Sequence, residues 1–185
     1  MEKNFIVECI VEIPKGSSNK YEYIPSRNII KLDRVLPGAN FYPGEYGFIE
    51  KTLDWDGDCL DVIFLSTYKT FPGCHVDVKI LGTINMIDDN EIDTKLFGVM
   101  ANDKRFEHTN NLDDVSINIR KEIETFFLQY KVLQNKEVKI NGWGTKQKGI
   151  QELNNCLQRY QDYKHVLKEK GIDAVKKIWN QKKEK

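Results

Sequence analysis

Three aspartates fall within six consecutive residues of this chain, in the segment Asp56-Gly57-Asp58-Cys59-Leu60-Asp61. Carboxylates this close repel one another unless a cation binds them or their pKa rises. Gly57 permits a tight backbone path on which the three side chains can converge. Oxygen ligands suit hard cations such as Mg²⁺, which is commonly shared with substrate phosphates. The segment therefore predicts a divalent-metal site. An acidic turn facing water fits the same six residues equally well, because Asp and Gly also favour turns.

A calcium loop of the EF-hand type is the first specific site to test. If Asp54 takes position 1 of such a loop, Asp56 and Asp58 take positions 3 and 5. The glycine required at position 6 is then Cys59, and the bidentate glutamate required at position 12 is Leu65. The EF-hand interpretation fails on both positions.

A second acidic run, Asp88-Asp89-Asn90-Glu91-Ile92-Asp93, lies between two strand candidates. By itself it is typical of a solvated turn. If the ends of two strands bring both acidic runs face to face, they would build a site for several metal ions. Asp93 and Lys95 are two residues apart, so in a strand both side chains project on one face.

Cations and phenols that could hold a polyanion are spread over several segments. They are Lys20, Arg34, Lys95, Lys131, Tyr42, Tyr46 and Tyr130. Residues 41–47 combine aromatic side chains with Pro43 and Gly44, which predicts a stiff exposed loop that presents phenols. Simple aromatic packing at the rim of a barrel is the alternative.

The first two-thirds of the chain must position these groups, and it reads mainly as strands and turns. Strands are expected at 6–13, 60–65, 76–84 and 94–100, with a hairpin of 21–24 and 29–32 around Pro25-Ser26. Residues 60–65 are almost continuously apolar, as in a strand covered on both faces.

The hydrophobic period then becomes helical. Apolar residues recur every three or four positions from Val115 to Tyr130, with Asp113-Asp114 as candidate caps. A short strand is expected at 138–140, ending at 141–144. A helix follows from Ile150, Gly171 breaks it, and 174–179 form a short third helix. This order predicts an α+β fold, a small β-barrel or curled sheet with helices packed outside.

Composition indicates one globular domain. The 185 residues are 40% hydrophobic and 11% aromatic, and 28 basic side chains balance 28 acidic ones. Neither a membrane span nor a secretory signal is recognisable. Four scattered cysteines without a C-x-x-C pair disfavour zinc and indicate reduced thiols, so a cytoplasmic location is expected.

Charge is distributed unevenly along the chain. Residues 1–145 carry 17 basic and 23 acidic side chains, whereas 146–185 carry 11 and 5. A basic tail can bind nucleic acid or acidic lipid. Its lysines alternate with apolar residues at helical spacing, which favours a solvated helix face.

Taken in order, these segments resemble the family I soluble inorganic pyrophosphatases. The family signature Asp-x-Asp-Pro-hydrophobic-Asp matches residues 56–61, except that Cys59 stands where Pro is usual. Further matches are Val11-Glu12-Ile13-Pro14, Lys20-Tyr21-Glu22, Asp33-Arg34, Phe41-Tyr42-Pro43, Tyr46-Gly47, Asp88, Asp93-Thr94-Lys95, Phe126-Phe127 and Tyr130-Lys131. The resemblance covers about residues 5 to 145 and finds no clear counterpart from about Ile150 onward.

The resemblance implies a five-stranded OB-like β-barrel with flanking α-helices. It implies one pyrophosphatase domain over residues 1–185, with a helical basic C-terminal extension at about 146–185. The implied activity is hydrolysis of pyrophosphate to two phosphates by a metal-activated water, with several Mg²⁺ ions per site. The short chain is similar in size to bacterial members, which implies a homohexamer rather than a dimer.

Site roles also follow from the resemblance. Asp56, Asp61 and Asp93 would hold the principal metals, with Asp61 bridging two of them. Asp88 would bind a further metal directly and Glu12 either directly or through water, and Asp58 would accept a proton from the attacking water. The phosphates would be held by Lys20, Arg34, Tyr46, Lys95, Tyr130 and Lys131, and Glu22 and Tyr42 would support the site.

Two other functions remain open at the level of sequence. A module that only binds divalent ions explains the carboxylates but not the matching Lys, Arg and Tyr positions. A nucleic-acid-binding OB-like barrel explains the basic tail and the aromatic residues. It requires a basic strand face, however, and the two acidic runs would repel phosphate without metals.

Overall fold

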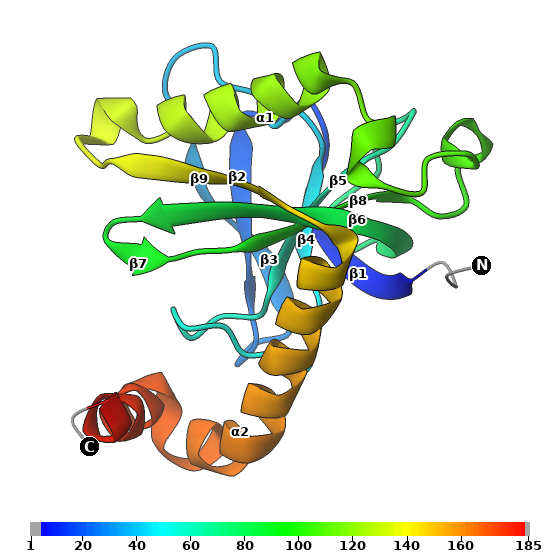
Figure 1. Ribbon diagram of the computed structural model, residues 1–185. Helices are drawn as coiled ribbons and strands as arrows, with labels where there is room; N and C mark the ends of the chain where they lie inside the picture. Colours follow the sequence, from blue (N-terminus) through cyan, green and yellow to red (C-terminus); the bar gives the residue numbers. More distant parts are fainter. Residues whose placement is uncertain (1–4, 184–185) are drawn as a thin grey trace.

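The computed structural model describes residues 5–183, in which five strands close into a ring (Figure 1). These strands are β1 (Ile6–Ile13), β4 (Glu45–Phe48), β5 (Asp61–Leu65), β8 (Lys95–Met100) and β6 (His75–Asp88). Each pairs with the next in that order, and β6 pairs back to β1; β5 and β8 run parallel and the other pairs antiparallel. The expected five-stranded OB-like architecture is confirmed.

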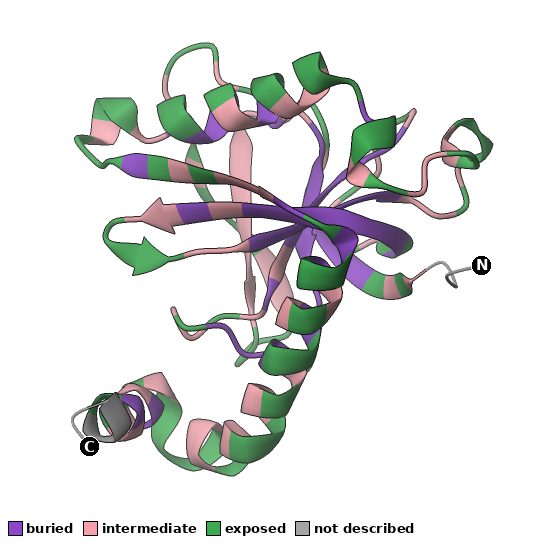
Figure 2. Ribbon diagram, in the orientation of Figure 1, coloured by how far each residue is buried: buried purple, intermediate pink, exposed green. Residues whose placement is uncertain are grey.

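Alternate side chains along the strands point to opposite faces of the sheet and form two hydrophobic cores. On β5, Ile63 and Leu65 join a cluster that includes Phe127 of α1 (Ile117–Gln129), whereas Val62 and Phe64 join a cluster that includes Leu153 of α2 (Lys146–Lys183). Successive side chains of a strand point to opposite faces, so each helix covers one face. Figure 2 shows the buried residues concentrated where the strands of the ring cross. The expectation that 60–65 is covered on both faces is confirmed.

The remaining strands extend this ring. The hairpin of β2 (Asn19–Ile24) and β3 (Ile29–Val35) forms as expected. β6 continues beyond the expected end and pairs with β7 (Glu91–Ile92) and β9 (Val138–Gly144). The expected loop at 88–93 is therefore a hairpin, because Asp89 and Asn90 both adopt positive φ (53° and 67°), as a tight turn of the primed type requires.

The helices agree with the sequence pattern except at their first residues. Asp113 and Asp114 do not cap α1: they lie in a 3₁₀ turn (Leu112–Asp114), and the Ser116 hydroxyl accepts the Asn118 N–H instead. Two further 3₁₀ turns span Lys104–Phe106 and Val132–Gln134. α2 starts four residues before Ile150.

The break expected at Gly171 is present, because this residue has φ 73° and ψ 179° and interrupts the helical path of α2. The last residues of the expected basic extension, 184–185, lie outside the described residues. Among the helices of the described residues, none combines the length and apolar character that crossing a membrane needs.

Candidate metal and phosphate site

An open pocket lies between the β2–β3 hairpin and the ring. Six of the expected site residues line it: Glu12, Lys20, Glu22, Tyr46, Asp58 and Asp61. They come from β1, β2, β4, the start of β5 and the loop before it. Residues up to 49 positions apart in the chain thus meet at one opening, and half of the ten residues that line it are charged.

Asp61 is the centre of the hydrogen bonding beside this pocket. One carboxylate oxygen, Oδ2, accepts the hydroxyl proton of Tyr46 and lies 2.8 Å from Lys95 Nζ. Lys95 Nζ also lies 2.7 Å from Asp93 Oδ1. The two acidic runs of the sequence therefore face each other, with a lysine between them, as the hypothesis of a multi-metal site required.

The two neighbouring carboxylates compensate the charge of Lys95, which is buried. Its side chain is 4% exposed. Burial alone would lower the pKa of Lys95, but the carboxylates of Asp61 and Asp93 hold it well above its ordinary value. Burial and Asp61 also raise the pKa of Tyr46, so its hydroxyl stays a donor. The result is a fixed set of donors around one carboxylate.

A second group of contacts forms where α1 ends beside the end of β6. Asp88 Oδ2 accepts the hydroxyl proton of Tyr130 at 3.0 Å and pairs with the ammonium of Lys131. The other oxygen, Asp88 Oδ1, is buried and has no hydrogen-bond partner. A buried acceptor without a partner needs a cation or donor from outside the chain, and a metal ion meets that need.

Three further carboxyl groups have raised pKa values, so a bound cation would be favourable beside each of them. Burial, followed by repulsion from Asp61, raises the pKa of Glu12 to about 7, even though its Oε1 accepts the Tyr23 N–H at 2.6 Å. Burial also raises the pKa of Asp56 to about 7, and burial and Asp61 raise the pKa of Asp58. Bound divalent ions would reverse these shifts. The all-oxygen donor set fits Mg²⁺.

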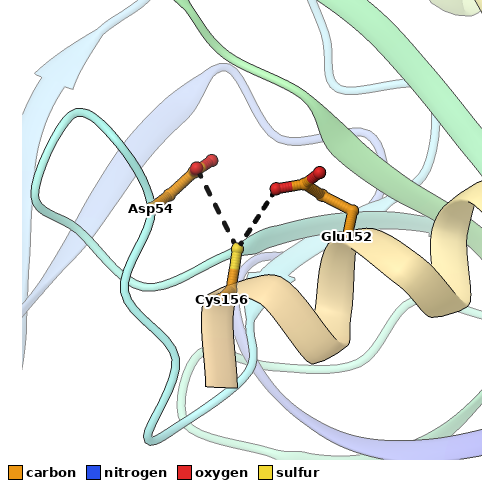
Figure 3. Close-up of side chains that lie close together, drawn as sticks. All are labelled: Asp54, Glu152 and Cys156. Carbon is orange, nitrogen blue, oxygen red and sulfur yellow. Dashed lines mark hydrogen bonds between the residues drawn. The ribbon is translucent and has the colours of Figure 1, made fainter. Parts of the chain in front are cut away.

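These carboxylates are nevertheless not drawn together around a single point. Over residues 5–183, no three of the expected ligand oxygens lie within 4.8 Å of one another; the one group of metal-type ligands with that spacing is Asp54, Glu152 and Cys156 (Figure 3). The positive charge within this group comes from the side chain of Arg159, whose Nη2 lies 3.1 Å from both Asp54 Oδ1 and Glu152 Oε1. Sequence reasoning missed this group. Its one signal was Glu152 and Cys156 at helical spacing.

The remaining expected residues lie around the same region. Lys20 pairs with Glu22, and its register partner on β3 is Arg34, which pairs with Asp33. The Arg34 Nε is buried and lacks a hydrogen-bond partner. Two donors of the hairpin are thus neighbours, and one of them, Lys20, lines the pocket.

Residues 41–47 depart from the expectation of a stiff exposed loop, and residues 45–47 belong to the buried strand β4. Tyr42 and Tyr46 are 2% and 8% exposed, so the loop packs its phenols instead of presenting them to solvent. The Tyr42 ring packs on Tyr46 (5.4 Å between centroids) and on Phe126 (4.7 Å). The alternative interpretation of this segment, aromatic packing, is therefore correct for Tyr42. Tyr46 is packed and still reaches Asp61.

Comparison with known proteins decides the family. The profile of the inorganic pyrophosphatase family matches residues 9–161. The chain belongs to the inorganic pyrophosphatase family. It is 46% identical to the inorganic pyrophosphatase of Thermus thermophilus over 84% of this chain and 90% of that protein. It is 44% identical to that of Malacoplasma penetrans, over 90% and 92% of the two chains.

Solved structures of the inorganic pyrophosphatase family agree in fold. The Thermus thermophilus enzyme superposes with a TM-score of 0.83 at 44% identity, over 87% of this chain and 94% of that one. The Helicobacter pylori inorganic pyrophosphatase gives a TM-score of 0.83 at 34% identity, over 87% and 96%. The part of α2 after residue 161 lies beyond the family match.

Proposed function

We propose that this chain hydrolyses inorganic pyrophosphate to two orthophosphates with the help of Mg²⁺. The single observation that carries the proposal is the Asp61–Lys95–Asp93 arrangement, in which a buried cation joins the two acidic runs beside an open charged pocket. Membership of the inorganic pyrophosphatase family supports the same reaction.

The metal ligands of the proposal are carboxylates of the two acidic runs together with Glu12. Asp56, Asp61 and Asp93 would hold the principal ions, with Asp61 shared between two. Asp88 and Glu12 would hold further ions, which fits the partnerless Asp88 Oδ1 and the raised pKa of Glu12. When bound, Mg²⁺ supplies positive charge to the phosphate oxygens and makes water a better nucleophile at neutral pH.

Side chains of the protein would accept the proton and bind the phosphates. Asp58 is exposed at the pocket and would accept the proton of the attacking water, which its raised pKa favours. The phosphoryl oxygens gain charge in the transition state, and fixed donors stabilise it. The donors are Lys20, Arg34, Tyr46, Lys95, Tyr130 and Lys131, with Glu22 and Tyr42 in support.

A phosphate-release assay tests this function against its alternatives. We expect the purified chain to release two phosphates per pyrophosphate with Mg²⁺ and none with EDTA. A module that only binds ions would bind Mg²⁺ without releasing phosphate. A nucleic-acid-binding barrel would release none and would bind single strands in a salt-sensitive way. Either result would overturn the proposal.

Three properties of the whole protein belong to the same proposal. The chain would be one domain, since α2 packs on the ring through Leu153 and Cys156. It would act in the cytoplasm, which the four free cysteines fit. It would be a homohexamer, and the exposed Leu128, Val132 and Leu133 at the end of α1 offer apolar contact area. Light scattering should give about 130 kDa, six times the 21.6 kDa of one chain; about 43 kDa would indicate a dimer.

A further inference from the structure

The loop that carries Asp56 and Asp58 is held by few bonds of its own. The Asp54 N–H donates to Asp58 O (2.8 Å), the Gly57 N–H donates to Asp54 O (3.1 Å), and the Asp58 N–H donates to Asp56 Oδ1 (2.9 Å). Gly57 has φ +102°. A short loop of this kind, with like charges on it, needs outside support to keep one conformation.

Arg159 of α2 supplies the first support. Its Nε donates to Leu53 O at 2.8 Å and its Nη2 to Asp54 Oδ1 at 3.1 Å, and its guanidinium lies 4.4 Å from the centroid of the Trp55 ring. Glu152, on the same helix, accepts from Nη2 as well. Figure 3 shows Asp54 opposite Glu152 and Cys156 of this helix. One arginine thus contacts three consecutive residues just before Asp56.

The part of α2 beyond Gly171 supplies the second support. The chain changes direction at Gly171 (Figure 1), and the segment after it packs against the loop that precedes β5. Ile172 then covers Gly57 so closely that a Cβ on Gly57 would lie 2.3 Å from Ile172 Cγ1. Val175 and Trp179 pack with Leu53, and the Trp179 ring meets that of Trp55 at 5.2 Å.

The same segment also reaches the second acidic run. Lys176 Nζ lies 3.7 Å from Glu91 Oε1 in the β6–β7 hairpin. Residues 162–183 lie outside the family match, so this support is built largely from sequence that the family profile does not describe. Apart from Lys176, the side chains share one target, the loop that precedes β5.

We propose that Arg159, Ile172, Val175 and Trp179, here called the clasp, are positioning residues that hold the Asp54–Asp58 loop in the conformation that binds metal. The inference rests on the proposed function, because the role of Asp56 as a ligand belongs to it. The clasp contacts no substrate group; it acts through the loop. Residues that orient metal ligands in this way commonly change metal affinity by about 10- to 100-fold when removed.

Two variants test the clasp from its two sides. Arg159→Ala removes the guanidinium, and Ile172→Ala removes the cover of Gly57 while leaving Arg159 in place, so one variant remains if the other fails to fold. Arg159→Lys keeps the charge but loses the planar fork and should lie between wild type and Arg159→Ala. Lys168→Ala, an exposed position on the same helix, is the matched control.

The first measurement uses hydrogen exchange of the metal-free protein. In Arg159→Ala and Ile172→Ala, the amides of residues 54–58 should exchange at least about tenfold faster, with β5 and β6 unchanged. The second is the Mg²⁺ concentration for half-maximal pyrophosphate hydrolysis. It should rise about tenfold, and saturating Mg²⁺ should restore turnover to within about threefold.

The two measurements separate failure of the clasp from failure of the proposed function. Unchanged exchange at 54–58, or faster exchange with an unchanged Mg²⁺ requirement, would overturn the positioning role. Absence of Mg²⁺-dependent hydrolysis in the wild type would instead overturn the proposed function, and the exchange data would still report whether α2 holds the loop.

Discussion

Asp61 is the residue on which the contacts of the site converge. It begins β5, accepts from Tyr46, pairs with Lys95 and faces the pocket. It is also a principal cause of the raised pKa of Glu12 and of Asp58. A residue with this many charged neighbours sets the electrostatics of the whole opening, so its own charge is the most informative one to remove.

Replacing Asp61 with asparagine should abolish most activity. The Asp61→Asn side chain is nearly the same size but lacks the charge that a shared metal ligand needs, and we expect turnover to fall at least ~100-fold. Steady-state phosphate release at saturating Mg²⁺ measures this. Asp113→Asn is the matched control, because the Asp113 carboxylate is 95% exposed and lies 3.8 Å from Arg120. Near-normal turnover of Asp61→Asn would refute its role.

Cys59 is the one departure within the signature. Among the described residues its N–H has no acceptor, and its φ is not in the left-handed region, so proline would remove no backbone hydrogen bond there. Burial and then Asp61 raise the pKa of the Cys59 thiol to about 11, so a thiolate is disfavoured at neutral pH.

Proline at this position should therefore stiffen the metal loop. We expect Cys59→Pro to raise the free energy of unfolding by about 0.5–1 kcal/mol, since it restricts the unfolded chain, and to lower the Mg²⁺ requirement. Urea unfolding and Mg²⁺ titration of hydrolysis measure the two effects. Cys59→Ala separates loss of the thiol from gain of the ring. Identical curves for both variants and the wild type would show that the position is neutral.

At the scale of elements, close strand contacts constrain the site more tightly than turns do. Gly47 lies beside Tyr46 on β4, and a Cβ there would lie 2.1 Å from Ile10 O of β1. Gly47→Ala must push β4 away from β1, and we expect a loss of at least about 2 kcal/mol in the free energy of unfolding, measured in urea. Gly142→Ala is the comparison, because its Cβ would meet nothing within 4 Å and only its φ of +90° opposes alanine. Equal losses would contradict a steric cause.

The sequence predicted those elements whose side chains follow one period. Four of the five ring strands, the β2–β3 hairpin, α1 and the break at Gly171 all had a local signal. The fifth ring strand, β4, was missed because residues 41–47 combine Pro, Gly and aromatic residues, which indicated a loop. The cap of α1 was assigned wrongly because Asp113 and Asp114 are good caps by type, yet Asp114 accepts the N–H groups of Asn110 and Asn111 in a turn of its own. β7 was missed because a two-residue strand has no period.

Long-range partners were the part of the site that the sequence could not predict. The positions of Asp61, Asp93 and Lys95 were identified, but their contact depends on the parallel pairing of β5 with β8. The contact between Arg159 and Asp54 joins residues 105 positions apart and has no signature in either segment. The burial of Tyr42 likewise depends on Phe126 of α1.

Across the whole molecule, the uneven charge of the sequence has a structural counterpart. The acidic part forms the ring and its pocket, and the basic part forms α2, which returns over the acidic loop. Arg159 and Lys176 of this helix pair with Asp54 and Glu91 of the acidic part. Part of the basic tail is therefore used within the chain, which supports the interpretation of a helix face over that of a nucleic-acid arm.

Two carboxyl groups of the acidic part have raised pKa values, and they should make the free energy of unfolding depend on pH. The folded, metal-free chain raises the pKa of Glu12 from 4.5 and of Asp56 from 3.8, each to about 7. The folded state then holds protons that the unfolded chain has already released. Stability from these groups is fully present below about pH 4 and is lost as pH rises through about 7. Asp103 and Asp114, whose pKa values hydrogen bonds lower, titrate below this window.

Urea unfolding with and without Mg²⁺ tests this coupling. In EDTA the free energy of unfolding should be lower at about pH 8 than at about pH 5.5, by on the order of 2 kcal/mol. Excess Mg²⁺ should remove or reverse the difference, because metal binds the deprotonated carboxylates and adds its own binding free energy to the folded state. Glu12→Gln should flatten the profile in EDTA, since it removes one titrating group. A metal-free protein that gains stability between these pH values would show that the carboxylates of the pocket are already neutralised by Lys20, Lys95 and Lys131, and that no deficit of positive charge draws cations into the site.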